Sequence, residues 1–388
     1  MNPPDIALLV ATYQRPEHLR RCLLSIALQQ DVPGRMEVVV SDDGSTDETA
    51  DVVSEFARRI DFPVGFTTHP HDGFRLAQTR NEGVAASSAP YLLFLDGDCV
   101  LPSDHVRIHM QRRKPNFVMA GDCCRLEQEP SARVTDAVIR SGEFRGWGSP
   151  REERRLAKLC RAGWFYRAIR HPNKPKLIGN NVGIWRRDYE RVNGYDENFF
   201  GWGCEDDDLR YRLRRAGVEI QSILHHTRTY HLWHPSHETA PARWRDGMNV
   251  KYLLRTARLT RCRNGLVKRG VEDLSIRVVG EPDEPQAAAR LLRERGVELP
   301  DQRGGGATNS GSGPEVEILF LPGRGGFTRR AEYRVLVALD EPSAAAPAAR
   351  RADVLIGPWP RGTDSGRKAG EQKRFSLQEL ARALDAVA

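Results

Sequence analysis

Short apolar runs alternate with amphipathic segments along the first hundred residues. Ile6–Tyr13 and Met36–Ser41 have the length and composition of buried strands. Residues 18–30 instead repeat their apolar side chains every three or four positions, which predicts a helix with one buried face. The alternation continues through a helix at 50–58, a strand at 64–67 and a helix at 76–86. Strands that alternate with helices predict right-handed crossovers and a parallel sheet.

The stretch 91–100, YLLFLDGDCV, is the strand around which we expect the sheet to form. Its apolar residues lie between Pro90 and Gly97, and a strand buried on both faces is typical of a helix-covered parallel sheet. Asp96 and Asp98 follow, at the strand end where open α/β sheets bind ligands. Two carboxylates this close repel each other unless a cation lies between them, and hard oxygen ligands suit Mg²⁺ or Mn²⁺ bound with substrate phosphates. A polar turn is the simpler alternative.

Two more strands are expected downstream. Residues 118–124 predict a strand that pairs with the central one, and 177–185 a strand whose Asn180 and Asn181 place amides beside the cleft. Residues 131–176 are basic and aromatic, and they are predicted to form a helical insertion in which sugars or lipid could rest.

Acidic residues mark two other element boundaries. Asp42 and Asp43 end the second strand, where a carboxylate can accept the N3 hydrogen of uracil or a ribose hydroxyl; a plain helix N-cap is the alternative. The four acids 205–208 open a helix that Gly217 closes. They favour the helix dipole but repel each other, so only one or two are expected to face one cavity. The others are expected to cap the helix, pair with nearby arginines or hydrogen-bond a ligand.

His231 and His234 stand three residues apart near the end of this region. A neutral imidazole is a common ligand for divalent metals, and a pair that follows two acidic clusters predicts at least one metal ligand. A structural role is the alternative for either histidine.

Composition limits the class of protein. The percentages of 39% hydrophobic and 29% charged residues are typical of a soluble globular protein. A length of 388 residues exceeds one average domain, so we expect one large α/β domain with an appendage. No apolar run reaches the roughly 18 residues that a membrane helix needs. The start lacks the basic region of a signal peptide, so a cytoplasmic location is expected, with peripheral contact at the inner face of the membrane as a possibility. Seven cysteines without CxxC spacing indicate neither a disulfide framework nor a zinc site.

Basic residues are concentrated in two segments. Arg151–Lys176 holds nine Lys or Arg against two Glu, and Arg243–Arg269 nine against one Asp, whereas the whole chain carries a net charge of +7. Such segments suit anionic lipid headgroups, nucleic acid or an acidic glycan; solvated helix faces around a phosphate-binding cleft are the alternative. We expect no nucleic-acid partner, and the oligomeric state stays open.

Seven motifs occur in the order seen in glycosyltransferase family 2: VATYQRP, SDDGSTD, GFRLAQTRNEGVAAS, FLDGDCVLP, GNNVGIWRRDYERVNGYDE, FGWGCEDDDLRYRL and HLWHP. Together they cover Ile6–Pro235, and the chain most resembles the chondroitin-polymerase-like and galactosyltransferase-like members. The resemblance implies a GT-A fold, which is a Rossmann-like, mostly parallel sheet flanked by helices. Cys204 departs from the pattern because a glycine usually stands there, which changes the freedom of that loop.

The resemblance also implies roles for residues on the donor side. Thr12 and Asp43 would hold the nucleotide base, and Asp96 and Asp98 would form the DxD motif, with Asp98 as the direct metal ligand. His234 would be the late metal ligand, with His231 as a second candidate. The remaining candidates for nucleotide contact are Arg15, Arg75 and Arg80, the last two at the pyrophosphate.

On the acceptor side, the resemblance implies that Asp206 is the catalytic base. Glu205 and Asp207 would bind acceptor hydroxyls, and Trp202 would stack on a sugar face. The expected activity is a metal-dependent, inverting transfer from a nucleotide sugar, expected to be UDP-linked, to a glycan or glycolipid in polysaccharide biosynthesis. The alternatives are a catalytically silent nucleotide- or glycan-binding scaffold and a nucleotidyltransferase.

The resemblance stops near Gly270, so we expect a transferase domain at 1–270 and a small α/β module of unassigned role at 271–388. The module is predicted to contain strands at 274–280, 316–321, 333–339 and 353–356, a helix at 285–295 and a final helix that begins at Ser376. Residues 301–314 have the composition of a flexible linker. Gly323–Gly326 is interpreted as a glycine turn rather than a phosphate loop.

Overall fold

The structure is a computed structural model of the chain. It describes residues 3–169, 171, 174–255, 259–279, 290, 292–294, 314–321, 327, 331–338, 348, 351–356 and 377–387. The chain divides into two compact units: Met1–Leu254 with Asn264–Leu266, and Arg255–Arg263 with Val267–Ala388.

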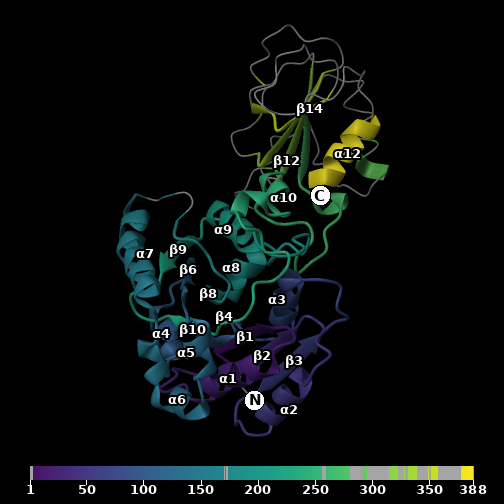
Figure 1. The fold of residues 1–388 in the computed structure, drawn as a ribbon. Helices are drawn as coiled ribbons and strands as arrows, with labels where there is room; N and C mark the ends of the chain where they lie inside the picture. Colours follow the sequence, from purple (N-terminus) through teal and green to yellow (C-terminus); the bar gives the residue numbers. More distant parts are fainter. Residues whose placement is uncertain are drawn as a thin grey trace. The chain divides into compact units, whose positions relative to one another are not determined.

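A seven-stranded sheet with the order β3-β2-β1-β4-β8-β6-β9 is the centre of the first unit (Figure 1). Its strands are β1 (Ile6–Thr12), β2 (Met36–Asp42), β3 (Val64–Thr68), β4 (Tyr91–Asp96), β6 (Phe117–Ala120), β8 (Asn181–Trp185) and β9 (Glu219–Ser222). All neighbouring pairs are parallel except the two that β8 makes. The predicted α/β class, a mostly parallel sheet flanked by helices, is therefore confirmed.

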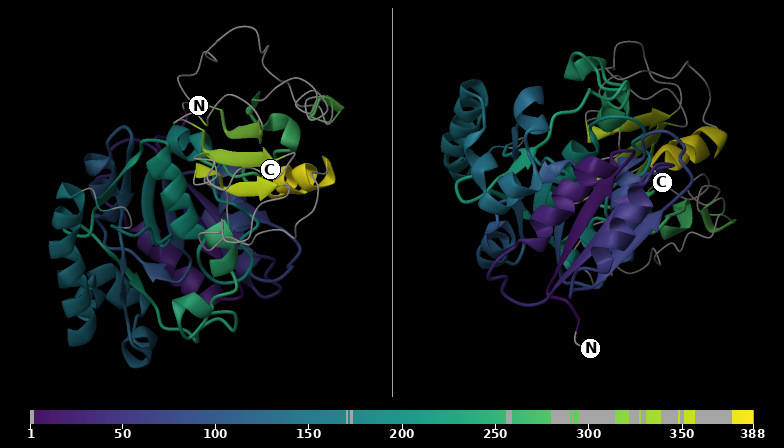
Figure 2. Two further views of the ribbon diagram at one scale, coloured as in Figure 1. Left: turned by 90° about the horizontal axis from the view of Figure 1, so that it is seen from above. Right: turned by 60° about the horizontal axis from the view of Figure 1, so that its bottom comes forward.

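Helices bury both faces of this sheet. Alternate β1 residues such as Ile6 and Leu8 pack with α1 (Pro16–Ala27), α2 (Thr49–Ala57) and α4 (His105–Arg112). The residues between them, such as Ala7 and Leu9, pack with α3 (Leu76–Ala85), α8 (Arg186–Arg191) and α9 (Glu205–Arg215). Figure 2 shows α1 and α2 side by side over the first strands. The apolar β4 residues are fully buried, as their pattern predicted. The polar residue that ends β4 lies where the strand leaves the sheet at its carboxyl end.

The prediction that residues 118–124 form one strand beside the central strand was wrong. Gly121 and Asp122 interrupt it, so that β6 ends at Ala120 and β7 (Cys123–Arg125) belongs to another sheet. The neighbour of β4 is β8, which runs antiparallel to it and separates it from β6. In the second sheet β10 (Thr229–His231) lies between β5 (Cys99–Val100) and β7. This pairing brings the histidine segment back to the end of β4.

The predicted insertion is helical. The helix α5 (Gln128–Ala132) ends inside it, and it contains α6 (Asp136–Ser141), the 3-10 helix η1 (Glu143–Gly146) and the long helix α7 (Pro150–Ala168). The 3-10 helix η2 (Trp244–Asp246) and α10 (Val250–Arg255) follow the second sheet. Gly217 follows α9 with a φ of +80°, as the helix-stop prediction requires. Among the described residues, no helix combines the length and apolarity needed to cross a bilayer.

The second unit contains the 3-10 helix η3 (Val271–Asp273) and a four-stranded parallel sheet with the order β11-β12-β13-β14. The strands are β11 (Ile276–Val279), β12 (Val316–Leu321), β13 (Tyr333–Ala338) and β14 (Val354–Ile356), and the last helix is α12 (Leu377–Val387). Its apolar residues pack with the strands, as in Leu380 and Leu384. The predicted linker at 301–314, apart from Pro314, lies outside the described residues, as do Gly323–Gly326 and most of the predicted helix at 285–295.

Candidate active site

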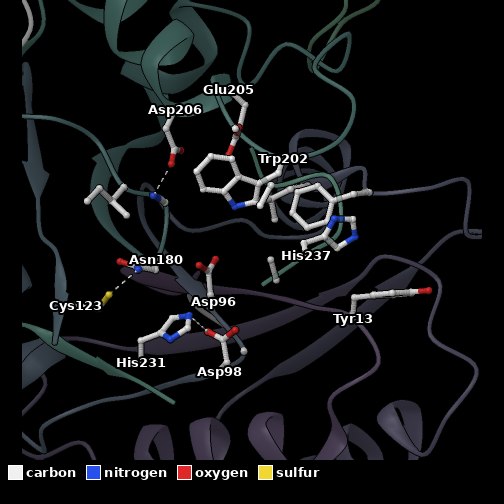
Figure 3. A pocket seen from close by; sticks show the side chains of 18 of the residues that line it. Tyr13, Asp96, Asp98, Cys123, Asn180, Trp202, Glu205, Asp206, His231 and His237 are labelled. Atoms are coloured by element: carbon white, nitrogen blue, oxygen red, sulfur yellow. Dashed lines mark hydrogen bonds and ion pairs between the residues drawn. The ribbon is translucent and has the colours of Figure 1, made fainter. Parts of the chain in front are cut away.

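A cavity of about 730 Å³ lies at the carboxyl ends of β1, β2 and β4. Its other walls are the segment before β8, the start of α9 and the segment after β10. All the predicted site residues line it except Arg75: Thr12, Arg15, Asp43, Arg80, Asp96, Asp98, Trp202, Glu205, Asp206, Asp207, His231 and His234. Figure 3 shows Asp96, Asp98 and His231 on one side of this space and Trp202, Glu205 and Asp206 on the other.

Asp98 and the two histidines form a three-residue cluster. The His231 Nε2 atom lies 3.4 Å from Asp98 Oδ1, and the His234 Nε2 atom lies 3.1 Å from Asp98 Oδ2. One ligand atom from each residue lies within 4.8 Å of the other two. A carboxylate oxygen and imidazole nitrogens converge here from the end of β4 and the end of β10, which are more than a hundred residues apart in sequence.

The orientation of His234 fits a divalent cation. Its Nδ1 lies 2.7 Å from the Pro235 carbonyl oxygen, which can only accept a hydrogen bond, so Nδ1 carries a proton. In the neutral imidazole the Nε2 lone pair then faces the Asp98 carboxylate, an arrangement that is repulsive unless a proton or a metal ion lies between them. A mixed carboxylate and imidazole set is a common donor set for divalent transition metals.

The charges around Asp98 keep it ionised. Burial acts to raise the pKa of this carboxyl, but His231, His234 and the Arg15 guanidinium, 3.6 Å away, outweigh it and hold the pKa below its usual range. The hydrogen bond to Asp98 in turn raises the pKa of His234. Asp98 is therefore available as an anionic ligand at neutral pH.

Arg80 connects three of the cavity acids. Its buried guanidinium lies 3.1 Å from Asp96, 3.2 Å from Asp206 and 3.7 Å from Glu205. The Tyr195 ring packs 5.1 Å from the same group. Burial raises the pKa of Asp96 although Arg80 opposes it. Arg80 thus lies in the cavity wall, where it fixes the acids on both sides of the cavity.

Asp206 is held by three donors. The Tyr195 hydroxyl donates to Oδ1 at 2.8 Å, Arg80 donates to Oδ1 at 3.2 Å, and the Gly179 backbone N–H donates to Oδ2 at 2.9 Å. The residue lies in the first turn of α9, just after Cys204, whose φ of +79° is the left-handed conformation that glycine adopts more readily. The sequence pattern predicts no role for Tyr195 or Gly179, because donors brought in by tertiary packing leave no local pattern.

Three of the four acids at the start of α9 line the cavity, more than the one or two expected. Asp207 also accepts a hydrogen bond from Arg210 at 2.7 Å. Only Asp208 turns away, to pair with Arg212. Glu205 is 7% exposed, and burial together with the neighbouring Asp206 raises its pKa to about 8. Trp202, 44% exposed, adds an accessible apolar face.

Replacing Glu205 by glutamine is expected to increase thermal stability, and increasingly so at higher pH. Because the folded-state pKa of about 8 lies above the ordinary 4.5, the stability that protonated Glu205 provides is complete below pH 4.5 and is lost as pH rises to 8. Glutamine mimics the protonated form and avoids this loss. Melting curves from pH 5 to 8 should show a growing gain, with each kcal/mol worth about 2–4 °C. A gain that does not change with pH would contradict this ionisation.

Asp43 is not a plain helix cap. It is 4% exposed; its Oδ1 lies 2.9 Å from His69 Nε2, and its Oδ2 accepts the Arg75 backbone N–H at 3.0 Å. His69 in turn lies 2.8 Å from Glu82 on α3. Burial raises the pKa of Asp43. It is Asp47 that accepts the Thr49 N–H at the start of α2.

The remaining donor-side candidates differ in position. Thr12 ends β1 and lies against Gly97, where an added Cβ would come within 3.1 Å of its side chain. Arg75 lies outside the lining, because its side chain pairs with Asp72 and covers the Phe200 ring at 4.8 Å. Tyr13, to which the sequence analysis gave no role, lines the cavity and stacks on His71 with ring centroids 4.4 Å apart.

Comparison with known families gives two matches. Residues 7–141 match the family described as glycosyl transferase family 2, and residues 167–237 match the N-terminal domain of galactosyltransferase. The first match contains Thr12, Asp43, Asp96 and Asp98, and the second contains the start of α9 and both histidines.

Individual relatives match just over half of the chain. Validoxylamine A glucosyltransferase of Streptomyces hygroscopicus subsp. limoneus is 31% identical over 234 residues, which is 56% of this chain and 49% of the relative. Chondroitin synthase of Escherichia coli is 25% identical over 239 residues, 56% of this chain and 33% of the relative. The chain thus spans half the length or less of these two relatives. Among solved structures, a mannosyltransferase from Pyrobaculum calidifontis, PcManGT, in complex with GDP-Man and Mn²⁺, is 18% identical with a TM-score of 0.41, over 63% of this chain and 59% of that chain.

Proposed function

We propose that this chain, whose residues 7–141 match glycosyl transferase family 2, is a metal-dependent, inverting glycosyltransferase. Its donor is a nucleotide sugar, and its acceptor is a hydroxyl group of a glycan or glycolipid in polysaccharide biosynthesis. The observation that carries this proposal is the convergence, in one cavity, of the Asp98, His231 and His234 cluster and the hydrogen-bonded Asp206.

Asp98 and His234 would hold a divalent cation, Mn²⁺ or Mg²⁺, with His231 as a further ligand. The two imidazoles, which accompany a single carboxylate, favour Mn²⁺ over Mg²⁺. When bound, such an ion neutralises the charge that develops on a departing nucleotide diphosphate. The residues of the chain provide its ligands, and Arg15 adds positive charge 3.6 Å from Asp98.

Asp206 acts on the acceptor as the general base. Its carboxylate takes the proton of the acceptor hydroxyl, whose oxygen then forms a bond to the anomeric carbon as the bond from that carbon to the diphosphate breaks. A single displacement of this kind inverts the anomeric configuration. Tyr195, Gly179 and Arg80 hold Asp206 in one orientation for this step.

The nucleotide base binds at the ends of β1 and β2. Asp43 is held by His69 and the Arg75 N–H, and Tyr13 provides a flat ring beside it. A buried carboxylate can accept the N3 hydrogen of uracil, which supports UDP as the donor nucleotide. Trp202, Glu205 and Asp207 contact the acceptor sugar on the opposite side.

A panel of nucleotide sugars with and without Mn²⁺ tests the proposal. UDP-sugars are expected to raise the melting temperature only when Mn²⁺ is present, because a ligand selective for the folded state stabilises it. The stabilising donor is then incubated with glycan acceptors, and the anomeric configuration of the product is determined by NMR. Stabilisation without turnover on any acceptor would favour the silent scaffold, and transfer of a nucleotidyl group would favour the nucleotidyltransferase.

Replacing Tyr195 by phenylalanine is expected to lower kcat about 10-fold or more without changing nucleotide affinity. The hydroxyl donates to the Asp206 carboxylate, and a hydrogen bond to a charged group is worth about 1.5–3 kcal/mol. Tyr252→Phe is the matched control, because this half-buried hydroxyl also donates to a carboxylate, that of Asp196, and neither residue lines the cavity. Steady-state rates and nucleotide titrations compare the two. Equal rates for both variants would show that Tyr195 does not position Asp206.

A further inference from the structure

One exposed stripe of α7 is purely cationic over most of its length. Arg151, Arg154, Lys158, Arg161 and Phe165 follow each other at steps of three or four residues, and all five are exposed. This spacing places them on one side of the helix. We call these five residues, with Ile169 just beyond the helix end, the outer stripe.

The acids of α7 point to the opposite side. Glu152 lies 2.8 Å from Arg155 and accepts the Arg125 backbone N–H at 3.0 Å. Glu153 pairs with Arg228 at 2.7 Å. Leu156 is buried on the same inner side, where α7 packs against β9. Both negative charges of the helix are thus paired with arginines of the first unit.

The charges of the cations in the outer stripe are exposed to solvent. Arg154 donates from Nε to the Pro150 carbonyl at 3.0 Å, which leaves its charge uncompensated. Within the described part of the chain, none of Arg151, Arg154, Lys158 and Arg161 forms a salt bridge. Unpaired cations arranged along one line attract an extended anionic surface.

The end of the outer stripe is apolar. Phe165 is 53% exposed and Ile169 is 51% exposed, next to each other in space by helical spacing. An aromatic ring can stack on a nucleic-acid base, but an exposed aliphatic side chain gains nothing there. Basic residues followed by Phe and Ile instead match an interfacial helix, which contacts lipid headgroups with its cations and inserts its apolar side chains between them.

We propose that the outer stripe of α7 docks onto a membrane surface that contains anionic phospholipids. Arg151, Arg154, Lys158 and Arg161 contact the headgroup phosphates, and Phe165 and Ile169 enter the boundary of the acyl chains. The proposal does not depend on the proposed transfer reaction, because it concerns the face of α7 opposite its contacts with the rest of the first unit.

Vesicle co-sedimentation of the full chain tests the proposal. Binding is expected to equimolar phosphatidylcholine and phosphatidylglycerol, to weaken in high salt, and to be absent with pure phosphatidylcholine. The double substitution Lys158→Gln and Arg161→Gln is expected to weaken binding about 10-fold or more, since each cation near such a surface adds to the attraction. Phe165→Ser is expected to weaken it at every salt concentration, because the contact it removes is apolar.

The matched control is Arg58→Gln with Arg59→Gln. These exposed residues follow α2, which packs against β3, the edge of the sheet opposite β9. The control removes the same charge and is expected to bind vesicles like the parent chain. Equal losses in both double variants would show a nonspecific charge effect and overturn the proposal. Absence of vesicle binding, with or without binding to a DNA oligonucleotide, would overturn it as well.

Discussion

Replacing Asp98 by asparagine is expected to abolish metal-dependent nucleotide binding and, with it, sugar transfer. Asp98 is the only carboxylate of the metal cluster found among the described residues, and it lies within 3.4 Å of both imidazoles. Asparagine keeps the shape but loses the negative charge that a divalent ion requires. Because even residues that only support ligands lower metal affinity about 10- to 100-fold when changed, we expect a loss above about 100-fold here.

Isothermal titration with Mn²⁺ and UDP measures this loss. Asp122→Asn is the matched control, because Asp122 is a buried carboxylate that pairs with Arg155 at 2.9 Å and does not line the cavity. It is expected to lose stability but to keep metal affinity. If Asp98→Asn still binds UDP in a Mn²⁺-dependent way at the parent affinity, the cluster is not the metal site.

Replacing Asp206 by asparagine is expected to separate binding from transfer. The amide cannot take a proton from the acceptor hydroxyl, and loss of a general base typically lowers kcat about 10²- to 10⁴-fold. Nucleotide affinity should change little, because Asp206 faces Tyr195 and Gly179 rather than the metal cluster. Steady-state rates at saturating donor, together with UDP titrations, measure the two effects separately.

Asp207→Asn is the control for this substitution. Asp207 also lines the cavity in the same helical turn, but its partner is Arg210. We expect it to raise the KM of the acceptor while leaving kcat within about 10-fold of the parent value, since it binds but does not take the proton. Transfer at the parent rate in Asp206→Asn would remove Asp206 from the role of base.

The sequence predicts the parts of this fold in which each strand carries its own signal. β1, β2 and β4 are mostly apolar, so their positions and their buried faces followed from the pattern. The polar residues that end them, Thr12, Asp43 and Asp98, then had to lie at one edge of a parallel sheet. The spacing of His231 and His234 predicted a metal ligand, but their convergence with Asp98 at this edge was expected only from the family resemblance.

Tertiary pairing explains the failures. Residues 118–120 and 123–124 are apolar, but no local pattern shows that β8 would pair antiparallel with β4 and take that place. The side chain of Arg75 was expected to contact the nucleotide, but it pairs with Asp72 and packs over the Phe200 ring. The role of Tyr195 was not predicted, because its hydroxyl reaches Asp206 only after α9 packs on the sheet. Contacts between distant segments are thus what local patterns fail to record.

The most direct measurement is a crystal structure with UDP and Mn²⁺ in which anomalous scattering locates the ion. We expect one manganese peak bound by Asp98 and His234 in the cavity, with the diphosphate beside it and the uracil ring near Asp43. A manganese ion bound elsewhere, or a nucleotide bound in this cavity with no ion between its phosphates and Asp98, would show that Asp98 and His234 are not the metal site.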